Sequence, residues 1–285
     1  MKVERITVVG CGLIGASFAL ALRRGGAGVR LAGWDLSAAT LEQALRTGVI
    51  DEVDEAIPRG QVSPSDLVYL AMPVGAIIRF LQERGAQVAR GAIVTDAGST
   101  KSEVCDAALN YLPAGRHFVG GHPVAGSHLP GLAHARADLF ADAPYVLINE
   151  QGHTNEAALA TVRELVGVLG ARAVVTAAAE HDRAMALVSH LPQLISSALA
   201  ATVNGQPEAA ALRRLAGTGY RSMTRLAESP WAIWGDIFST NAGPVASALD
   251  ELLDKLAAVR DELRQGASRP KSRLAKTGAL FGGPR

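Results

Sequence analysis

The feature that most constrains the fold is a glycine pattern close to the N-terminus. The stretch VVGCGLIG places glycine at positions 10, 12 and 15, between a β-branched run and a segment with helical periodicity. In such a pattern Gly10 permits the tight turn, Gly12 lets the backbone approach a pyrophosphate, and Gly15 lets the helix pack on the strand. The helix N-terminus then offers amide hydrogens to the phosphates. The pattern predicts a dinucleotide-binding turn between a strand and a helix.

An acidic residue at the end of the next expected strand indicates which dinucleotide is bound. Asp35 closes the segment VRLAGWD, and a carboxylate there accepts hydrogen bonds from the adenosine ribose and repels a 2′-phosphate. We therefore expect NAD rather than NADP as the cofactor. Leu13 and Ile14 inside the glycine motif, and Pro73 at the end of a later strand, are further expected cofactor contacts. The alternative is a glycine turn without a ligand, in which Asp35 only caps the following helix.

Strand-like and helix-like segments alternate along the first part of the chain. Strands are expected at residues 5–10, 29–35, 66–73, 91–98, 117–123, 144–149 and 171–177. Their alternation with amphipathic segments predicts a parallel sheet joined by right-handed crossovers, which ends near residue 176.

The pattern changes after residue 176, because nearly every later segment has helical periodicity. An apolar stripe runs from Val245 to Val259. The expected fold class is therefore α/β, with a Rossmann-type NAD-binding domain over residues 1–176 and an all-α domain over residues 177–266. Residues 267–285 are basic and rich in helix breakers, and we expect a flexible tail there.

Composition and charge argue against several classes of protein. The 285 residues carry 28 basic and 27 acidic side chains, so no nucleic-acid or membrane-surface partner is expected. The sequence contains no run of about 18 uncharged apolar residues, so no membrane-spanning helix is expected. Cys11 and Cys105 lack a second thiol at metal-binding spacing, so no metal site is expected. Two isolated cysteines favour a reduced, cytoplasmic setting.

An ionisable ring stands among very small residues in the stretch FVGGHPVAGSH. Gly120 and Gly121 let the chain run close to a ligand, and Pro123 stiffens the turn that aims His122. A neutral imidazole accepts a proton well near neutral pH. Ser99, in TDAGSTK after an earlier strand, is a candidate to hold the same substrate hydroxyl. On the residues alone, a structural histidine in a tight turn is as acceptable as a catalytic one.

Six segments, taken in order, resemble the prephenate and arogenate dehydrogenases of tyrosine biosynthesis. They are VVGCGLIGASFALAL, DAGSTK, GGHPVAGS, EHDRAMALVSHLP, TRLAESPWAIWGDIF and TN at 240–241, and the resemblance covers residues 4–265. The resemblance implies an NAD-dependent oxidoreductase that converts prephenate to 4-hydroxyphenylpyruvate by oxidative decarboxylation, with arogenate as the alternative substrate. It also implies a homodimer formed through the helical domain.

The resemblance also assigns roles to individual residues. His122 matches a catalytic histidine, which accepts the proton of the ring hydroxyl as hydride leaves the same carbon for NAD+ and the ring carboxylate leaves as CO2. Ser99 matches a serine that hydrogen-bonds the hydroxyl and orients the imidazole. Arg225 matches a substrate-binding arginine, whose guanidinium fork suits a carboxylate. Ser127 matches a small hydroxyl residue near the substrate side chain.

One position departs from the family pattern. Prephenate-using members often carry a histidine where this chain has Gln193, which we expect to bind substrate. Its amide oxygen would accept hydrogen bonds from the ammonium of arogenate, whereas its amide nitrogen would donate to the keto oxygen of prephenate. The preference stays open, with prephenate favoured and dual use retained. Nearby, His181 and Asp182 are expected either as an ion pair near the site or as a solvated helix N-terminus.

Two other classes of protein share parts of this pattern. β-Hydroxyacid dehydrogenases and imine reductases also join a Rossmann domain to helices, but they usually place a lysine on the first long helix of the second domain. Residues 183–205 contain no lysine. An NAD-sensing regulator would need a recognition helix or a basic face, and the basic residues here gather only in the tail.

Overall fold

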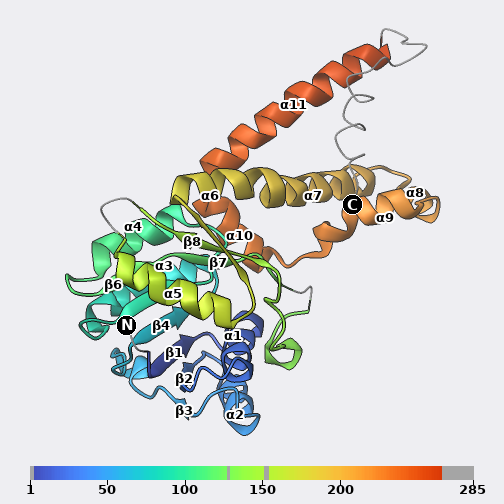
Figure 1. The fold of residues 1–285 in the computed structure, drawn as a ribbon. Helices are drawn as coiled ribbons and strands as arrows, with labels where there is room; N and C mark the ends of the chain where they lie inside the picture. The colour runs from blue at the N-terminus through green and yellow to red at the C-terminus, as the bar shows by residue number, and fades with distance from the viewer. Residues whose placement is uncertain (1–2, 127–128, 151–153, 265–285) are drawn as a thin grey trace. The chain divides into compact units, whose positions relative to one another are not determined.

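The computed structural model describes residues 3–126, 129–150 and 154–264 (Figure 1). Its internal contacts divide the chain into two compact units. The first unit contains the residues up to Met185 together with Glu228–Asn241, and the second contains Ala186–Ala227 and the chain from Ala242 onward.

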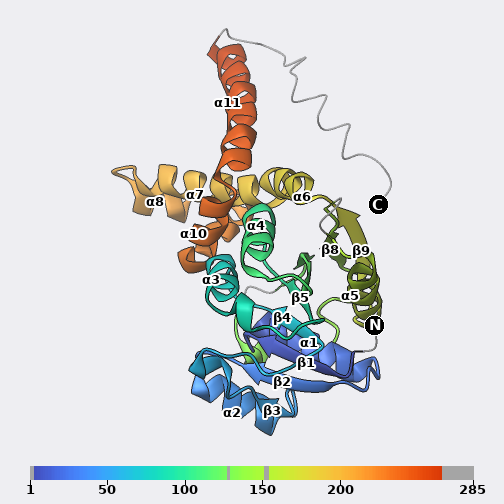
Figure 2. The ribbon, with the colours of Figure 1, turned by 90° about the vertical axis from the view of Figure 1, so that its left-hand side faces the viewer.

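A parallel sheet organises the first unit, in the strand order β3-β2-β1-β4-β5-β6. Its first five strands are labelled in Figure 2. Its strands are β1 (Arg5–Val9), β2 (Arg30–Trp34), β3 (Glu52–Val53), β4 (Leu67–Leu70), β5 (Ile93–Asp96) and β6 (His117–Val119). Every pairing in this sheet is parallel. The central strands are buried on both faces, as in sheets that are covered by helices on each side. The expected α/β fold class is confirmed, and the carboxyl ends of β1, β4 and β5 share one edge of the sheet.

Helices connect the strands of the first unit. They are α1 (Leu13–Arg24), α2 (Ala38–Arg46), α3 (Val74–Arg84), α4 (Ser102–Tyr111) and α5 (Glu156–Val168), with short 3₁₀ turns at Ile57–Arg59, Gly85–Gln87 and Leu132–His134. Side chains cap two of them, because the Ser37 hydroxyl accepts the amide hydrogen of Thr40 and the Asn155 side-chain oxygen accepts that of Ala158. These caps determine where α2 and α5 begin.

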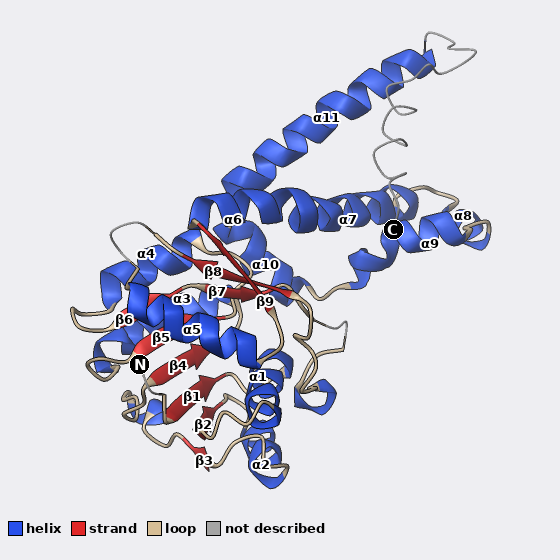
Figure 3. Cartoon of the chain, in the orientation of Figure 1, coloured by secondary structure: helices blue, strands red, loops and turns tan. Residues whose placement is uncertain are grey.

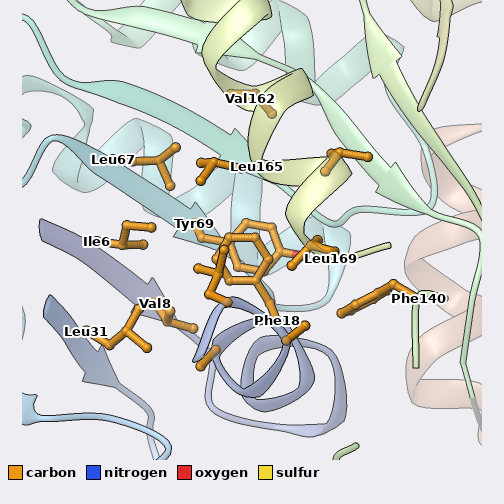
Figure 4. Close-up of a cluster of buried hydrophobic side chains, with 14 of the residues drawn as sticks. Ile6, Val8, Phe18, Leu31, Leu67, Tyr69, Phe140, Val162, Leu165 and Leu169 are labelled. Carbon is orange, nitrogen blue, oxygen red and sulfur yellow. The ribbon is translucent and has the colours of Figure 1, made fainter. Parts of the chain in front are cut away.

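The main core lies between the sheet and the helices α1 and α5 (Figure 4). Phe18 of α1 stacks on Tyr69 of β4, with ring centroids 3.9 Å apart, and Leu165 of α5 belongs to the same cluster. Full burial of a large apolar side chain contributes about 1.5–3 kcal/mol. This packing fixes α1 against the sheet, and with it the glycine turn that precedes the helix.

The segment 117–123, expected as one strand, forms two strands in different sheets. A second sheet contains β7 (Gly121–Pro123), β8 (Pro144–Ile148) and β9 (Arg172–Thr176). The first pair, β7 and β8, is antiparallel, and the second pair, β8 and β9, is parallel. The expectation of a single sheet that ends near residue 176 was therefore wrong.

The change of sheet occurs at two adjacent glycines. A Cβ atom on Gly121 would lie 2.5 Å from the backbone oxygen of Asp96, and one on Gly120 would lie 3.0 Å from the side chain of Ile148. Only glycine allows the backbone to pass so close to the end of β5. Alternating apolar residues do not reveal this break, because both strands continue the same pattern.

Helices make up the described part of the second unit (Figure 3). A continuous helix runs from Ala178 to Asn204 and consists of α6 (Ala178–Met185), a π-helical turn (Ala186–His190) and α7 (Leu191–Asn204), of which α6 belongs to the first unit. The remaining elements are α8 (Ala209–Arg214), α9 (Thr218–Thr224), a 3₁₀ turn (Arg225–Glu228) whose last residue groups with the first unit, and α11 (Ala242–Arg264).

By length and composition alone, the helix Ala178–Asn204 could span a membrane. Core helices of water-soluble proteins also meet these two criteria. Two of its buried polar side chains have partners inside the second unit. Gln193 donates to the Leu226 carbonyl, and the Ser196 hydroxyl accepts the amide hydrogen of Ala227. Such pairing is typical of a helix that packs against the rest of its own domain.

The helix α10 (Trp231–Thr240) groups with the first unit, although the sequence pattern assigned it to the helical domain. Asp236 accepts the amide hydrogen of Gly75 at 2.9 Å, and the hydroxyl oxygens of Thr240 and Thr100 lie 2.7 Å apart. Helical periodicity shows that a helix has an apolar face, but it does not show which domain that face packs against. These contacts could therefore not be predicted from the sequence. The domain boundary expected from the sequence stays a prediction.

Candidate active site

The glycine turn lies at the carboxyl end of β1 and is shaped for a dinucleotide. Gly10 has a φ of +96°, and a Cβ atom there would lie 2.3 Å from the Ala71 oxygen. A Cβ atom on Gly15 would lie 1.9 Å from the Gly10 oxygen, so packing alone requires glycine at both positions. Gly12 differs, since a Cβ atom there meets no heavy atom of the described chain within 4 Å. The open space beside Gly12 fits the approach of a pyrophosphate.

Backbone amides orient Asp35 beside this turn. Its Oδ2 accepts the amide hydrogen of Cys11 at 2.9 Å, and its Oδ1 accepts that of Ser37 at 2.9 Å. Each carboxylate oxygen keeps lone-pair capacity for a ribose hydroxyl. Burial, with a smaller contribution from the Asp35 charge, raises the pKa of the Cys11 thiol to about 12. That thiol is protonated at neutral pH and packs as a small apolar group.

The other expected cofactor contacts lie at the same edge of the sheet. Leu13 and Ile14 form the first turn of α1 and are half-buried, and Pro73 is exposed immediately before α3. Gly12 occupies the N-cap of α1 and has no side chain to cap the first-turn amides. Those amide hydrogens are available to an anion, which suits a phosphate. Direct contact with a cofactor stays a prediction for all three residues.

A buried ion pair, which the sequence reading did not identify, supports the loop that follows β5. The Lys101 ammonium pairs with the Asp96 carboxylate, and both side chains are completely buried. Asp96 also accepts the amide hydrogen of Gly121 at 2.9 Å, while Lys101 donates to the Gly121 carbonyl at 2.7 Å. Both backbone groups of Gly121 are thereby held, which fixes the start of β7 and the adjacent His122. The available signal was a pair of opposite charges five residues apart in TDAGSTK.

The imidazole of His122 meets a second imidazole and, through it, a carboxylate. His122 Nδ1 lies 2.8 Å from His181 Nε2, and the ring planes meet at 78° with centroids 5.1 Å apart. His181 Nδ1 lies 2.8 Å from Asp182 Oδ1. His181 and Asp182 are each 2% exposed, whereas His122 is half-buried. The buried arrangement excludes the solvated helix N-terminus as the interpretation of His181 and Asp182.

Asp182 is also the N-terminal anchor of α4. Its Oδ1 accepts the amide hydrogen of Lys101 at 2.7 Å, and its Oδ2 accepts that of Ser102 at 2.8 Å. Burial acts to raise the pKa of this carboxyl, but the hydrogen bonds from His181 and from these amides outweigh it and hold the pKa below its ordinary value. Asp182 is therefore a carboxylate at neutral pH, with negative charge beside His181.

The two expected hydroxyl residues have different outcomes. Ser99 is half-buried in the loop between β5 and α4, and its side chain makes no hydrogen bond to any residue that the structure describes. The group that contacts the Nδ1 of His122 is His181, so an orienting role of Ser99 stays a prediction. Ser127 lies outside the described residues.

The expected substrate-binding residues Arg225 and Gln193 belong to the second unit. Arg225 is exposed at the start of the 3₁₀ turn. Gln193 is 3% exposed, and its Nε2 donates to the Leu226 carbonyl at 2.8 Å. Its Oε1 is buried and has no hydrogen-bond partner within the described ranges. A buried acceptor of this kind requires an explanation, and a bound ligand is one.

The first unit contains a cavity of about 390 Å³ that neither Arg225 nor Gln193 lines. Its lining includes Cys105 of α4, Phe118 of β6 and Glu150, and it includes none of the site residues expected from the sequence. Burial raises the pKa of the Cys105 thiol to about 12, so the cavity holds no thiolate at neutral pH.

Together, the parallel sheet, the glycine turn and the oriented Asp35 define a dinucleotide-binding domain of the Rossmann type, joined to a helical unit. Two family models match this arrangement in order. Residues 18–175 match the nucleotide-binding domain of prephenate dehydrogenase, and residues 177–277 match its dimerization domain. The chain belongs to the prephenate dehydrogenase family.

Individual relatives agree with this assignment. The prephenate dehydrogenase of Bacillus subtilis (strain 168) is 33% identical over 276 residues, which cover 96% of this chain and 74% of the relative. The solved structure of prephenate dehydrogenase from A. aeolicus in complex with hydroxyphenyl propionate and NAD+ superposes with a TM-score of 0.90 at 27% identity, covering 98% of this chain and 97% of that one. The arogenate dehydrogenase of Synechocystis has a TM-score of 0.82 at 29% identity, covering 96% and 97%.

Proposed function

We propose that this protein is an NAD+-dependent dehydrogenase that converts prephenate to 4-hydroxyphenylpyruvate by oxidative decarboxylation. One observation carries the proposal: a half-buried imidazole, His122, is held by buried polar groups in the same unit as a glycine turn that is open at Gly12. The family matches over both parts of the chain supply the substrate class.

The cofactor assignment follows from the residues around the turn. Gly10, Gly12 and Gly15 would form the backbone cradle, and the first turn of α1, with Leu13 and Ile14, would direct amide hydrogens toward the phosphates. Asp35 would accept the ribose hydroxyls and Pro73 would border the cofactor on the next strand. When bound, NAD+ supplies the acceptor for the hydride.

The proposed reaction needs a base for one proton and groups that hold the substrate. His122 accepts the proton of the ring hydroxyl, and the C–H bond on the same carbon loses hydride, so the alcohol carbon becomes a carbonyl. The bond between the ring and its carboxylate breaks and releases CO2, and the electron pair of that bond makes the ring an aromatic phenolate. The phenolate then regains the proton from the His122 imidazolium and becomes the phenol. Ser99 would hold the hydroxyl, while Arg225 would bind a substrate carboxylate as a two-pronged donor. Ser127 would lie near the substrate side chain.

Arogenate is the second candidate substrate, and Gln193 favours it. The Leu226 carbonyl can only accept, so it must face the amide nitrogen of Gln193, and the buried Oε1 remains as an acceptor. The ammonium of arogenate donates hydrogen bonds, whereas the keto oxygen of prephenate does not. Gln193 would therefore add affinity for arogenate, as an enzyme with dual use requires.

A direct assay tests the proposed function. Purified protein is mixed with NAD+ and either prephenate or arogenate, and the absorbance of NADH is followed. We expect NADH formation with prephenate, and with arogenate if Gln193 acts as described. No turnover of either substrate would refute the assignment and favour another dehydrogenase with a helical second domain.

We further propose a homodimer assembled through the helical unit in the cytoplasm, without a nucleic-acid or membrane partner. The match to the family's dimerization domain supports this proposal. On α11 the apolar side chains of Leu253, Leu256 and Leu263 are 52%, 52% and 74% exposed, although Val245 is buried. Exposed leucines on one long helix are typical of a surface that a second copy covers. Light scattering of the purified protein should give twice the chain mass.

A further inference from the structure

We propose that His181 and Asp182 are positioning residues that set the tautomer of His122, so that Nε2 of His122 is the nitrogen that receives the substrate proton. The inference rests on the proposed function and adds to it the residues that prepare the base. It depends on a chain of two hydrogen bonds whose direction can be worked out from the acidic end.

The first step fixes the proton on His181. Asp182 is a carboxylate and can only accept hydrogen bonds, and its Oδ1 lies 2.8 Å from Nδ1 of His181. The Nδ1 of His181 must therefore carry a hydrogen and donate it. In the neutral ring the other nitrogen, Nε2, then has the lone pair.

The second step transfers this requirement to His122. Its Nδ1 lies 2.8 Å from the Nε2 of His181, which is an acceptor in the neutral ring. His122 must therefore donate through Nδ1, and a neutral imidazole with hydrogen on Nδ1 has its lone pair on Nε2. The opposite tautomer of His122 would place two lone pairs against each other, unless His181 carried a full positive charge.

The third step concerns the state after proton transfer. When Nε2 of His122 takes the substrate proton, the ring becomes an imidazolium that donates through Nδ1 to His181, whose own Nδ1 donates to the Asp182 carboxylate. The negative end of the chain thus stabilises the positive charge that forms during the reaction, as in other carboxylate-supported histidine bases.

Burial makes this arrangement rigid. Asp182 is held by the amides of Lys101 and Ser102, and its backbone oxygen accepts a hydrogen from the Asn241 side chain at 2.8 Å. Because His181 is almost fully buried, water does not compete for its nitrogens. The device is therefore in place before substrate binds, which removes a cost of reorganisation from the reaction.

Nuclear magnetic resonance of the intact protein tests the tautomer directly. Protein labelled with nitrogen-15 in its histidines is examined by long-range proton–nitrogen correlation, and the His122 signals are assigned by their loss in His122→Asn. We expect both His122 and His181 to carry their hydrogen on Nδ1. A hydrogen on Nε2 of neutral His122 would overturn the inference, even if the protein proved to be an active dehydrogenase.

A variant separates positioning from structural support. His181→Phe keeps a ring but removes both nitrogens, so we expect kcat to fall on the order of 10²-fold, NAD+ affinity to stay within about 2-fold, and the His122 signals to show mixed tautomers. The control is His134→Phe at an exposed position, which should behave as wild type.

Unchanged kcat in folded His181→Phe would overturn the inference. Wild-type protein inactive on both prephenate and arogenate would instead overturn the proposed function. If His181→Phe does not fold, the tautomer measurement on wild type decides.

Discussion

The two parts of the candidate site in the first unit are built in different ways. The cofactor turn and Asp35 come from one strand-helix-strand unit, whereas His122 meets His181 at a separation of 59 residues in the chain. The first part depends on local backbone shape, which glycine provides. The second part depends on tertiary contacts among buried polar groups. Cofactor recognition and proton transfer should therefore respond to different kinds of substitution.

The largest effect should come from removing the base itself. His122→Asn keeps a polar side chain on β7 but cannot accept a proton at the position of Nε2. We expect kcat to fall by about 10²–10⁴-fold, the range that a general base contributes, with NAD+ affinity nearly unchanged because the glycine turn is untouched. Steady-state kinetics and NAD+ titration measure both quantities. Turnover near that of wild type would make His122 only a turn residue.

The next largest effect should come from breaking the buried Lys101–Asp96 ion pair, which holds the backbone next to His122. Lys101→Met leaves the Asp96 carboxylate buried without its cation, so we expect the free energy of unfolding to fall by about 3–5 kcal/mol. The matched control is Arg23→Met, which breaks a pair whose side chains are 35% and 39% exposed and should cost about 1 kcal/mol or less. Urea unfolding measures both. Equal losses in the two variants would contradict the special role of the Lys101–Asp96 pair.

Two glycine variants test whether the glycines of the cofactor turn serve packing or NAD+ binding. Gly12→Val enters open space, so it should leave stability within about 0.5 kcal/mol and weaken NAD+ binding by about 10-fold or more. Gly15→Ala meets the Gly10 oxygen, so it should cost about 1–3 kcal/mol of stability. Thermal unfolding and NAD+ titration of both variants provide the test. Tight NAD+ binding by Gly12→Val would show that the pyrophosphate does not bind at this turn.

The smallest expected effect is a pH dependence that originates at Asp182. Its pKa is lower in the folded protein than in the unfolded chain, so the folded state is favoured above the unfolded pKa of about 4. This contribution is lost as pH falls through the folded pKa. The unfolding free energy of Asp182→Asn should therefore depend less on pH in the acidic range than that of wild type. Parallel slopes for the two proteins would contradict the assignment.

Sequence patterns predicted the parts of the molecule that local chemistry determines. The glycine triplet, Asp35 and the helix that begins after Ser37 are all visible as short motifs. By contrast, the break of strand 117–123 at Gly120 depends on the backbone of β5, which comes close only in the folded state. A strand pattern reports which face is apolar and does not report the sheet to which the strand belongs.

The same distinction separates the predicted from the unpredicted site residues. His122 stands out because its neighbours are small, and Ser99 because its loop follows a strand. The Lys101–Asp96 pair could not be derived, because its role depends on the complete burial of both side chains. The alignment of Asp182 with His181 could not be derived either, because it depends on tertiary contacts of 2.7–2.8 Å around the Asp182 carboxylate. Charged residues in a sequence are usually solvated, and only the structure shows which ones are not.

The most direct test of the central claim is a structure of the ternary complex with NAD+ and a hydroxyphenyl analogue of the product. The account predicts Nε2 of His122 within about 3 Å of the analogue's ring hydroxyl, with Nδ1 still on His181 and the pyrophosphate beside Gly12. An imidazole turned away from that hydroxyl, with another group in its place, would contradict the account.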